Sequence, residues 1–368
     1  MGAGTAQRGA CLLISGKVRK NMEFVVFAGV LLLLFIFMIV QELIQTKNQE
    51  KLFKKYLREN YGKEPPKEYS LERFARLGSY LERHKEEKQL DDITWNDLGM
   101  DEVFRRIDRT YSAAGEEYLY YTLRNISCGR EALEHLEEVV NWLQEQENIK
   151  VRIQLLMKRL GHLGKYSLYD YLDNLDYLGE RSNRKIVLGN LLYLPFLLLL
   201  FVQPAMGTIG IVLCMLWHIM TYFREKKVIE PYIISFAYVL RLIDVCEELE
   251  KQKIPVYRRE LDELREALKS LRELRRGAYW VMAGNQGKIG GNPLDILADY
   301  LRMILHLDIF QFNRMLEKLR KKTGQVETML AITGYLDMAI SVGGFRKSLE
   351  GYCIPKLEED TEKAFLHM

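Results

Sequence analysis

Residues 186–223 read IVLGNLLYLPFLLLLFVQPAMGTIGIVLCMLWHIMTYF and contain no Lys, Arg, Asp or Glu. An α-helix rises ~1.5 Å per residue, so one membrane span needs about 20 predominantly apolar residues. This stretch is long enough for two such spans. Gln203-Pro204 divides it, because proline lacks a backbone donor and favours a turn. The sequence therefore predicts a transmembrane hairpin with spans at 186–202 and 205–223.

Basic residues lie on both outer flanks of this hairpin, whereas its turn carries no charge. They are Arg181, Arg184 and Lys185 before the first span, and Arg224, Lys226 and Lys227 after the second. The positive-inside rule places both flanks in the cytosol, so the soluble segments 44–184 and 224–368 share one side of the membrane and can fold together. A buried hydrophobic hairpin inside a large soluble protein is the alternative interpretation.

A further apolar stretch, FVVFAGVLLLLFIFMIV, begins at Phe24, and we predict a first transmembrane helix at 24–42. A signal peptide is the competing interpretation, but no small-residue cleavage site follows Val40, which favours an uncleaved anchor. Basic residues lie on both sides of this stretch, so they leave the orientation of the N-terminus open. Residues 1–23 are Gly-rich and basic, and we expect them to be disordered.

The composition favours an all-α protein with reduced cysteines. The 368 residues are 48% hydrophobic and 28% charged, with only eight prolines. A net charge of +3 is too small to indicate nucleic-acid binding by itself. The five cysteines and six histidines are scattered, with no C-x-x-C or H-E-x-x-H motif. This excludes a disulfide framework and a recognisable zinc site.

The first soluble segment is predicted to be a charged helical connector at 43–93 followed by a helical core at 94–184. One amphipathic helix is expected around Met100–Ile107, with Asp97 as its N-cap or first-turn acid. The next helix would be capped by Thr110 or Ser112. Its first turn would hold Glu116 and Glu117, whose charges complement the helix dipole.

The second soluble segment, 224–357, is predicted to contain a coiled-coil-like arm, because leucines repeat at 261, 264, 268 and 271. Between 251 and 276 nine basic residues and five acidic ones give a net charge of +4. The basic residues are Lys251, Lys253, Arg258, Arg259, Arg265, Lys269, Arg272, Arg275 and Arg276. A solvated helix face with i,i+4 ion pairs and a surface that faces nucleic-acid phosphates are the two interpretations.

A glycine-rich loop at 283–293 contains Gly287-Lys288, but neither the earlier glycine nor the following Ser/Thr of a P-loop is present. A turn before a helix capped at Asn292, with Pro293 at its first position, explains the loop better. In that helix we expect His306 to be a core or helix-end residue. Asp295 and Asp299 are expected to be solvated carboxylates.

A last amphipathic helix is predicted at 325–341, with Val326, Leu330 and Leu336 turned inward. The sequence SVGGFRKSLEGYCIPKLEED then departs from the helical pattern, and residues 358–368 are predicted to form a C-terminal tail.

Several segments in order resemble the MutS family of DNA mismatch-repair proteins. IDRTYSAAGEEYLYYTLRNIS at 107–127 is similar to the start of that family's core, with Ile126-Ser127-Cys128 where the family has a proline. GNPLDILADYLRMILHLDIFQFN and LDMAISVGGFRKSLEGYCIP resemble later core segments. The matching positions of the first segment are Thr110, Ser112, Gly115, Leu119, Leu123 and Arg124. The resemblance covers roughly 94–357 and points to a membrane-associated branch with a MutS-like core and lever region.

The resemblance implies an ATP-driven, DNA-associated machine. From the predicted spans we expect a multi-pass protein of the cell membrane whose soluble segments lie in the cytosol. The family's ATPase uses G-x-x-x-x-G-K-[ST] to hold ATP and Mg²⁺, and that motif is missing from this sequence. We therefore expect no catalytic, cofactor or metal residue in this chain. The expected partners are membrane lipid, DNA, and either a second copy or a separately encoded ATPase half.

Two other function classes stay open. One is a membrane-anchored helical scaffold or oligomerisation protein with no nucleic-acid role, which the modest net charge favours. The other is an enzyme in its own right, against which the sequence shows no nucleophile–base pair, metal-ligand cluster or phosphate loop.

Overall fold

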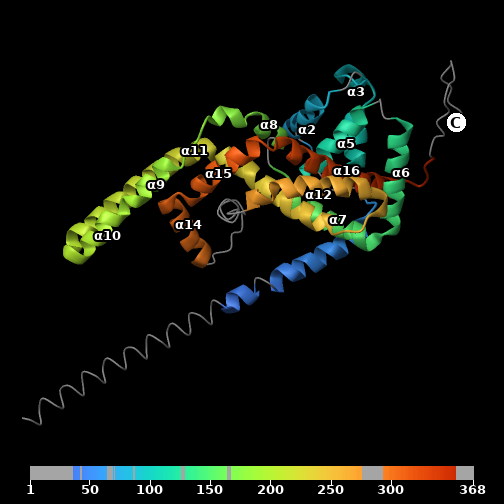
Figure 1. Ribbon diagram of the computed structural model, residues 1–368. Helices are drawn as coiled ribbons and strands as arrows, with labels where there is room; N and C mark the ends of the chain where they lie inside the picture. The colour runs from blue at the N-terminus through green and yellow to red at the C-terminus, as the bar shows by residue number, and fades with distance from the viewer. Residues whose placement is uncertain are drawn as a thin grey trace, which may run out of the picture. The chain divides into compact units, whose positions relative to one another are not determined.

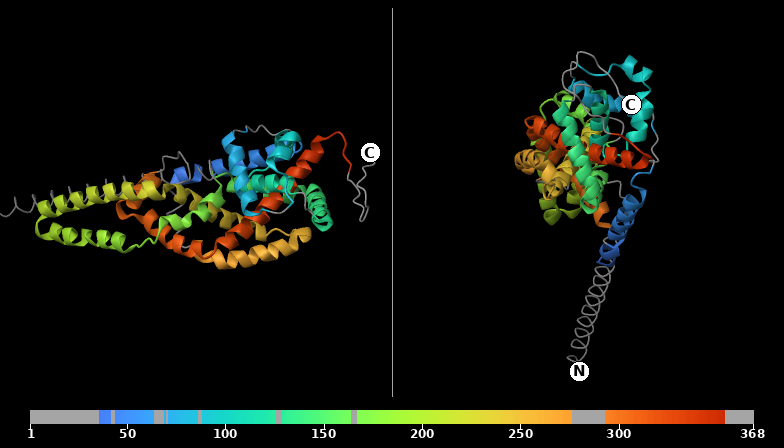
Figure 2. Two further views of the ribbon diagram at one scale, coloured as in Figure 1. Left: turned by 90° about the horizontal axis from the view of Figure 1, so that it is seen from above. Right: turned by 90° about the vertical axis from the view of Figure 1, so that its right-hand side faces the viewer.

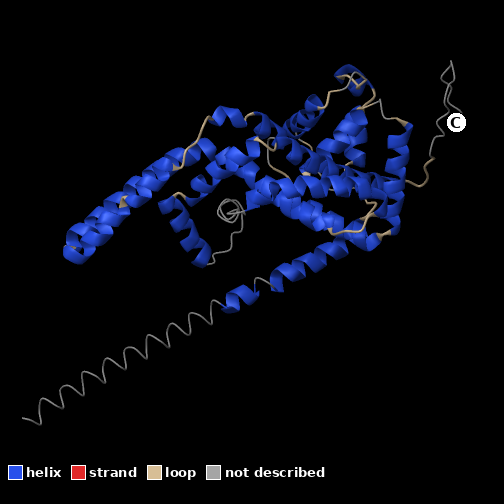
Figure 3. Cartoon of the chain, in the orientation of Figure 1, coloured by secondary structure: helices blue, strands red, loops and turns tan. Residues whose placement is uncertain are grey.

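The computed structural model describes residues 36–41, 44–63, 69, 71–85, 88–125, 129–163, 167–275 and 293–353. The chain divides into two compact units, residues 1–59 and residues 60–368. The described part of both is almost entirely helical, with a single isolated bridge between Gln89 and Asn125 (Figure 3). The predicted all-α fold is confirmed.

In the first unit, residues 36–41 and 44–59 are helical. The apolar side chains from Ile36 to Val40 are exposed. Most of the predicted first span at 24–42 lies outside the described residues, as do the N-terminal segment 1–23 and the tail 358–368.

Helix α16 (Thr323–Ser348) is the central helix of the second unit (Figures 1 and 2). It packs against α5 (Ala113–Arg124), α6 (Arg130–Glu145), α7 (Glu147–Leu160) and α12 (Arg258–Leu271). Buried residues follow one another on several of its faces, for example Leu336, Met338, Ala339 and Ile340. A helix that is apolar all round needs partners all round, and these helices supply them.

The other described helices of this unit connect these elements or form the hairpin. They are α2 (Leu71–Arg83), α3 (Asp92–Asp97), α4 (Met100–Ile107), α8 (Leu168–Asp173), η1 (Leu175–Leu178), α9 (Arg184–Leu191), α10 (Tyr193–Val202), α11 (Pro204–Glu250), η2 (Pro255–Tyr257), η3 (Arg272–Arg275), α14 (Pro293–Leu305) and α15 (Leu307–Arg320).

The end of α16 differs from the prediction, because the helix continues through Gly343 and Gly344 to Ser348 instead of ending near 341. Glycine costs roughly 1 kcal/mol in a helix interior, which is why the pair resembled a helix end. Here a Cβ at Gly343 would lie 2.7 Å from the Tyr61 hydroxyl, and one at Gly344 would lie 2.9 Å from Arg109 Cδ. Close packing of neighbours explains why both positions are glycine.

The start of α4 was also predicted wrongly. Asp97 is the last residue of α3 and does not cap α4; Asp91 caps α3 by accepting a hydrogen bond from the Thr94 amide at 2.7 Å. Helix α4 begins after Gly99, whose φ of 61° lies in the left-handed region that glycine adopts readily.

The leucine stripe of α12 is buried as expected, but α12 is not a projecting arm. It packs against α16 and α11, so its leucines belong to the main hydrophobic core. A short run of leucines at 3 and 4 spacing fits a bundle helix as well as a coiled coil, because both bury a stripe of that period.

Candidate functional site

The most distinctive surface of the second unit is an apolar hairpin that extends from one end of the bundle (Figures 1 and 2). One arm is α9 and α10, and the other is the first half of α11. No residue of α10 is buried. The exposed apolar side chains of the two arms are Val187, Leu188, Leu191, Leu192, Leu194, Leu197, Leu198, Phe201, Val202, Met206, Ile209, Val212, Leu213, Leu216, Trp217, Met220 and Phe223.

Three described helical segments are long and apolar enough to cross a membrane: Arg184–Val202, Pro204–Glu250 and Thr323–Ser348. The first two contain the spans predicted at 186–202 and 205–223. Their most apolar windows are 6% and 28% buried within the protein, against 72% for Thr323–Ser348. The last segment is α16, whose apolar side chains are mostly covered by the bundle, so of these three segments the two of the hairpin leave the most apolar surface exposed.

Prolines set the boundaries of the hairpin helices. Pro204 is the first residue of α11, where its missing N–H costs nothing. Pro195 removes the donor that Leu191 O would use, and α9 ends at Leu191. The predicted break at Gln203-Pro204 is confirmed, whereas the shorter break beside Pro195 was not predicted.

Small residues let the two arms approach closely. A Cβ at Gly207 would lie 2.6 Å from Leu200 N, and one at Gly210 would collide with the Phe196 ring. Gly207, Gly210, Cys214, His218 and Tyr222 are the buried residues of this half of α11, and they form one narrow stripe toward the other arm. Small residues at helix–helix contacts are typical of membrane-embedded packing.

Polar residues join the base of the hairpin to the bundle. Arg181 Nη2 lies 2.5 Å from Glu225 Oε2, and the Tyr222 hydroxyl donates to Asp308 Oδ2 at 2.7 Å. Burial raises the pKa of the Asp308 carboxyl. Asn190 Nδ2 donates to the Leu305 carbonyl at 3.1 Å, which ties α9 to the end of α14. These contacts hold the hairpin in a fixed relation to α14 and α15.

His306 lies at this junction, between α14 and α15, with a left-handed φ of 53°. Its Nδ1 is 3.3 Å from Nδ1 of His218 on α11, and both imidazoles are buried. Burial, and then the neighbouring His218, lowers the pKa of His306 from 6.5 to about 4. The expectation of a core or helix-end histidine is met in both respects, and no third ligand completes a metal site in the described residues.

The basic residues proposed to face nucleic acid lie after α11 and along α12. Lys251, Lys253, Arg258, Arg259, Arg265, Lys269 and Arg272 are exposed, whereas Arg276 and the side chain of Arg275 lie outside the described part. Arg265 pairs at 2.7 Å with both Glu250 and Asp262. Arg259 is 3.8 Å from Glu263, and Lys269 is 3.8 Å from Glu266. Much of the positive charge is therefore neutralised locally.

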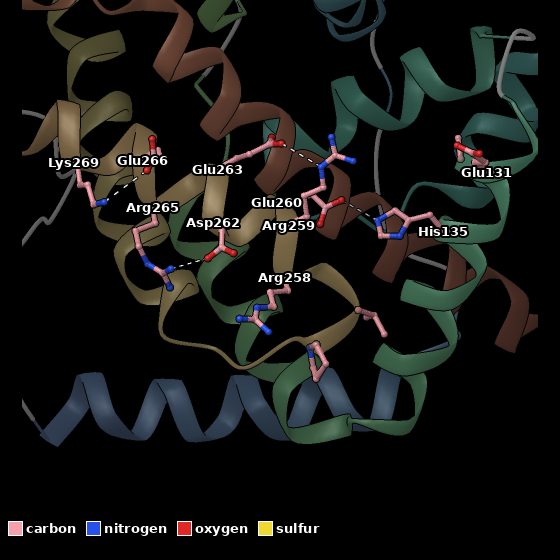
Figure 4. Close-up of a pocket in the computed structure, with 13 residues that line it drawn as sticks. Glu131, His135, Arg258, Arg259, Glu260, Asp262, Glu263, Arg265, Glu266 and Lys269 are labelled. Carbon is pink, nitrogen blue, oxygen red and sulfur yellow. Dashed lines mark hydrogen bonds and ion pairs between the residues drawn. The ribbon is translucent and has the colours of Figure 1, made fainter.

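Figure 4 shows the surface depression that these side chains line, between α12 and α6. Cations and carboxylates alternate along it, and His135 on α6 faces Glu260 with Nε2 and Oε1 3.1 Å apart. Alternation of sign gives no concentrated positive field for phosphate. The arrangement matches the interpretation of a solvated helix face with ion pairs.

A second polar site lies inside the core, where α5 meets α16. Asp337 of α16 accepts hydrogen bonds from the Ser112 amide at 2.8 Å and the Ser112 hydroxyl at 2.6 Å. Ser112 Oγ in turn accepts from the Gly115 amide, so Ser112 is the cap of α5, as expected. Thr110 instead donates to Asp108 at 2.6 Å.

Glu116, in the first turn of α5, and the adjacent Glu117 are both buried, which the sequence did not predict. Glu116 accepts from Arg76 Nη2 at 2.7 Å and from Arg73. For Glu117, burial raises the pKa from 4.5 to about 8 despite a hydrogen bond to Ser167. One acid is therefore an ion-pair partner and the other a neutral carboxylic acid at pH 7. The matching arginines lie about 40 residues earlier, in a segment read only as a charged connector.

Asp299, expected to be solvated, is exposed and pairs with the buried Arg302. The side chain of Asp295 and the loop at 283–292 lie outside the described part. Among the residues that the structure describes, no group of three or more His, Cys, Asp or Glu side chains could hold a metal ion. Comparisons with known protein families, with curated proteins and with solved structures found no match to this chain.

Proposed function

We propose that this chain is a membrane-anchored helical scaffold. The observation that carries this proposal is the change along α11. Its first half buries only a stripe of small and polar residues, whereas from Ile229 to Leu249 it is a buried core helix. One continuous helix of 47 residues, about 70 Å long at ~1.5 Å per residue, would thus link the lipid-embedded hairpin to the bundle.

The bundle would lie on the cytosolic side of a cell membrane, since the exposed Arg184, Lys185, Arg224 and Lys227 surround the base of the hairpin. Its role would be to hold a helical surface, and the partners that bind it, at the membrane. The exposed, ion-paired face of α12 would suit protein contacts.

Cysteine labelling tests this topology. Gln203→Cys at the hairpin turn and Glu266→Cys on α12 would be treated with a membrane-impermeant maleimide in right-side-out and inverted vesicles, with Cys353→Ser removing an exposed native thiol. Position 203 should react only in right-side-out vesicles and position 266 only in inverted ones. Labelling of both positions from one side would overturn the transmembrane hairpin.

A MutS-like, DNA-associated core is the second candidate. It is favoured by the contact between two segments that carry the resemblance: the turn at 110–112 and the helix containing Asp337 are hydrogen-bonded across 225 positions of sequence. In that proposal the chain would supply anchoring and a rigid relay, in a homodimer or with a separate ATPase half that binds ATP and Mg²⁺.

Gel shifts with the full chain in nanodiscs test DNA binding. Lys251, Lys253 and Arg258 form no ion pair within the described residues, so a variant with all three changed to Glu addresses the available cations. If they contact phosphates, the salt dependence of log K should weaken by about 0.9 per lost contact. The control is Arg105→Glu, Arg106→Glu and Arg130→Glu, which changes the charge equally on exposed positions of α4 and α6. Equal affinity of the two variants and the parent would favour the scaffold without a nucleic-acid role.

A further inference from the structure

Helix α14 presents apolar side chains to solvent beside the hairpin. Tyr300 is 56% exposed and Leu301 is 42% exposed, whereas Arg302 is 4% exposed and faces the bundle. Asp299, which is exposed, pairs with Arg302 and leaves Tyr300 and Leu301 as an uncharged strip. Such a strip on a short helix needs an apolar partner, and the position of α14 indicates which one.

Contacts with the hairpin fix how far along its length, counted from its base, the end of α14 lies. Its last carbonyl, from Leu305, accepts the Asn190 side chain, and the next residue, His306, packs on His218. Asn190 is six residues beyond Arg184, and His218 is six residues before Arg224. At ~1.5 Å per residue, both attachment points lie about 9 Å beyond the basic residues at the base.

Other features mark the same level as a membrane interface. Trp217, next to His218, is 51% exposed, and Trp and Tyr concentrate where membrane meets water. The left-handed φ of His306 makes the turn between α14 and α15. In Figure 1 the axis of α14 runs crosswise to the helices of the hairpin and not parallel to them. A helix at this depth and in this direction would lie in the plane of the bilayer surface.

We infer that α14 is an interfacial membrane helix that places Tyr300 and Leu301 at the boundary of lipid headgroups and acyl chains. This rests on the proposed membrane hairpin. Interfacial helices bury their apolar face about 5–10 Å into that boundary, which matches the depth set by Asn190 and His218. The exposed cations Arg184, Lys185, Arg224 and Lys227 would bind anionic headgroups at the same level.

Photocrosslinking to lipid tests the inference with three matched aromatic positions. The probe p-benzoylphenylalanine would replace Tyr300 on α14, Phe201 near the tip of the hairpin, or Tyr352 after α16; these residues are 56%, 90% and 50% exposed. Each full-length variant would be reconstituted in phosphatidylcholine–phosphatidylglycerol vesicles containing radiolabelled lipid, after its thermal unfolding is shown to match the parent.

Position 300 should form lipid adducts at a yield close to that of position 201 and several-fold above position 352. If position 201 forms lipid adducts but position 300 forms no more than position 352, the interfacial helix would be overturned. The membrane hairpin would still stand in that case. Crosslinks from position 300 to a second copy or to another part of the chain would also overturn it, since protein would then cover the strip. Absence of adducts at 201 would overturn the membrane hairpin itself.

Discussion

The carboxylate of Asp337 accepts hydrogen bonds from both the backbone amide and the hydroxyl of Ser112, 225 positions earlier in the chain. The Tyr111 amide donates to the same oxygen at 3.0 Å. A buried carboxylate with several donors is well stabilised, but only while all of them are in place. This single side chain joins the segment before the hairpin to the segment after it.

Removal of that carboxylate should destabilise the whole bundle. Hydrogen bonds to charged groups contribute roughly 1.5–3 kcal/mol each, so Asp337→Ala should lower the free energy of unfolding by about 3 kcal/mol or more. Asp262→Ala, at an exposed carboxylate on α12, should change it by about 0.5 kcal/mol at most. Chemical unfolding of the detergent-solubilised chain, followed by circular dichroism, measures both. Equal losses would show that Asp337 does not hold the core together.

Two glycines of α16 should respond in opposite directions to the same substitution. A Cβ at Gly334 would lie 2.6 Å from the Ala114 carbonyl, whereas one at Gly324 meets nothing within 4 Å. Gly334→Ala should therefore cost about 1–3 kcal/mol by forcing α5 and α16 apart. Gly324→Ala should stabilise by up to about 1 kcal/mol, because alanine has less freedom to lose in the unfolded chain. Thermal unfolding shows whether each variant is more or less stable than the parent. Stabilisation by Gly334→Ala would contradict the close approach of α5 and α16.

The apolar helical hairpin was predictable from sequence because its signal is local. An uncharged run with a proline-marked turn indicates two spans without reference to any other residue. The continuation of α16 through Gly343 and Gly344 was not predictable in that way. It depends on Tyr61 and Arg109, which lie far away in the sequence and pack against these two glycines in the folded chain.

The buried charges show the same limit more strongly. Glu116 and Glu117 are adjacent in sequence and look alike as first-turn acids. Only the positions of Arg73 and Arg76 distinguish the ion-paired carboxylate from the neutral one. Likewise, His218 and His306 each look unremarkable alone, and their contact spans 88 positions. Pairings at such distances require the fold.

Glu117 should make the folded protein less stable as the pH rises. Its pKa in the folded protein is about 8, against an ordinary value of 4.5. The folded state therefore keeps a proton that the unfolded chain releases in this interval, and stability falls as pH rises from about 4.5 to 8. Glu117→Gln removes this dependence, so it should raise the melting temperature at pH 8 more than at pH 5.

Glu116→Gln is the matched control at the adjacent position. It should destabilise by about 3–5 kcal/mol at pH 7, because Arg76 would remain buried without a charged partner. Melting curves of the parent and both variants between pH 5 and pH 8 measure these effects. A parallel pH dependence of Glu117→Gln and the parent would rule out a neutral Glu117.

His306 should make the folded protein less stable as the pH falls. Burial and His218 lower its pKa from 6.5 to about 4, so the unfolded chain takes up a proton before the folded state does. Stability should therefore be lost as pH falls from 6.5 through about 4.

His306→Asn removes the titrating ring and keeps a residue that tolerates the left-handed backbone. Its melting temperature should fall less than that of the parent between pH 6.5 and 4. His162→Asn, at an exposed histidine near Glu116, controls for removal of an imidazole elsewhere. An equal acid loss in the His306→Asn variant and the parent would show that another group carries the acid sensitivity.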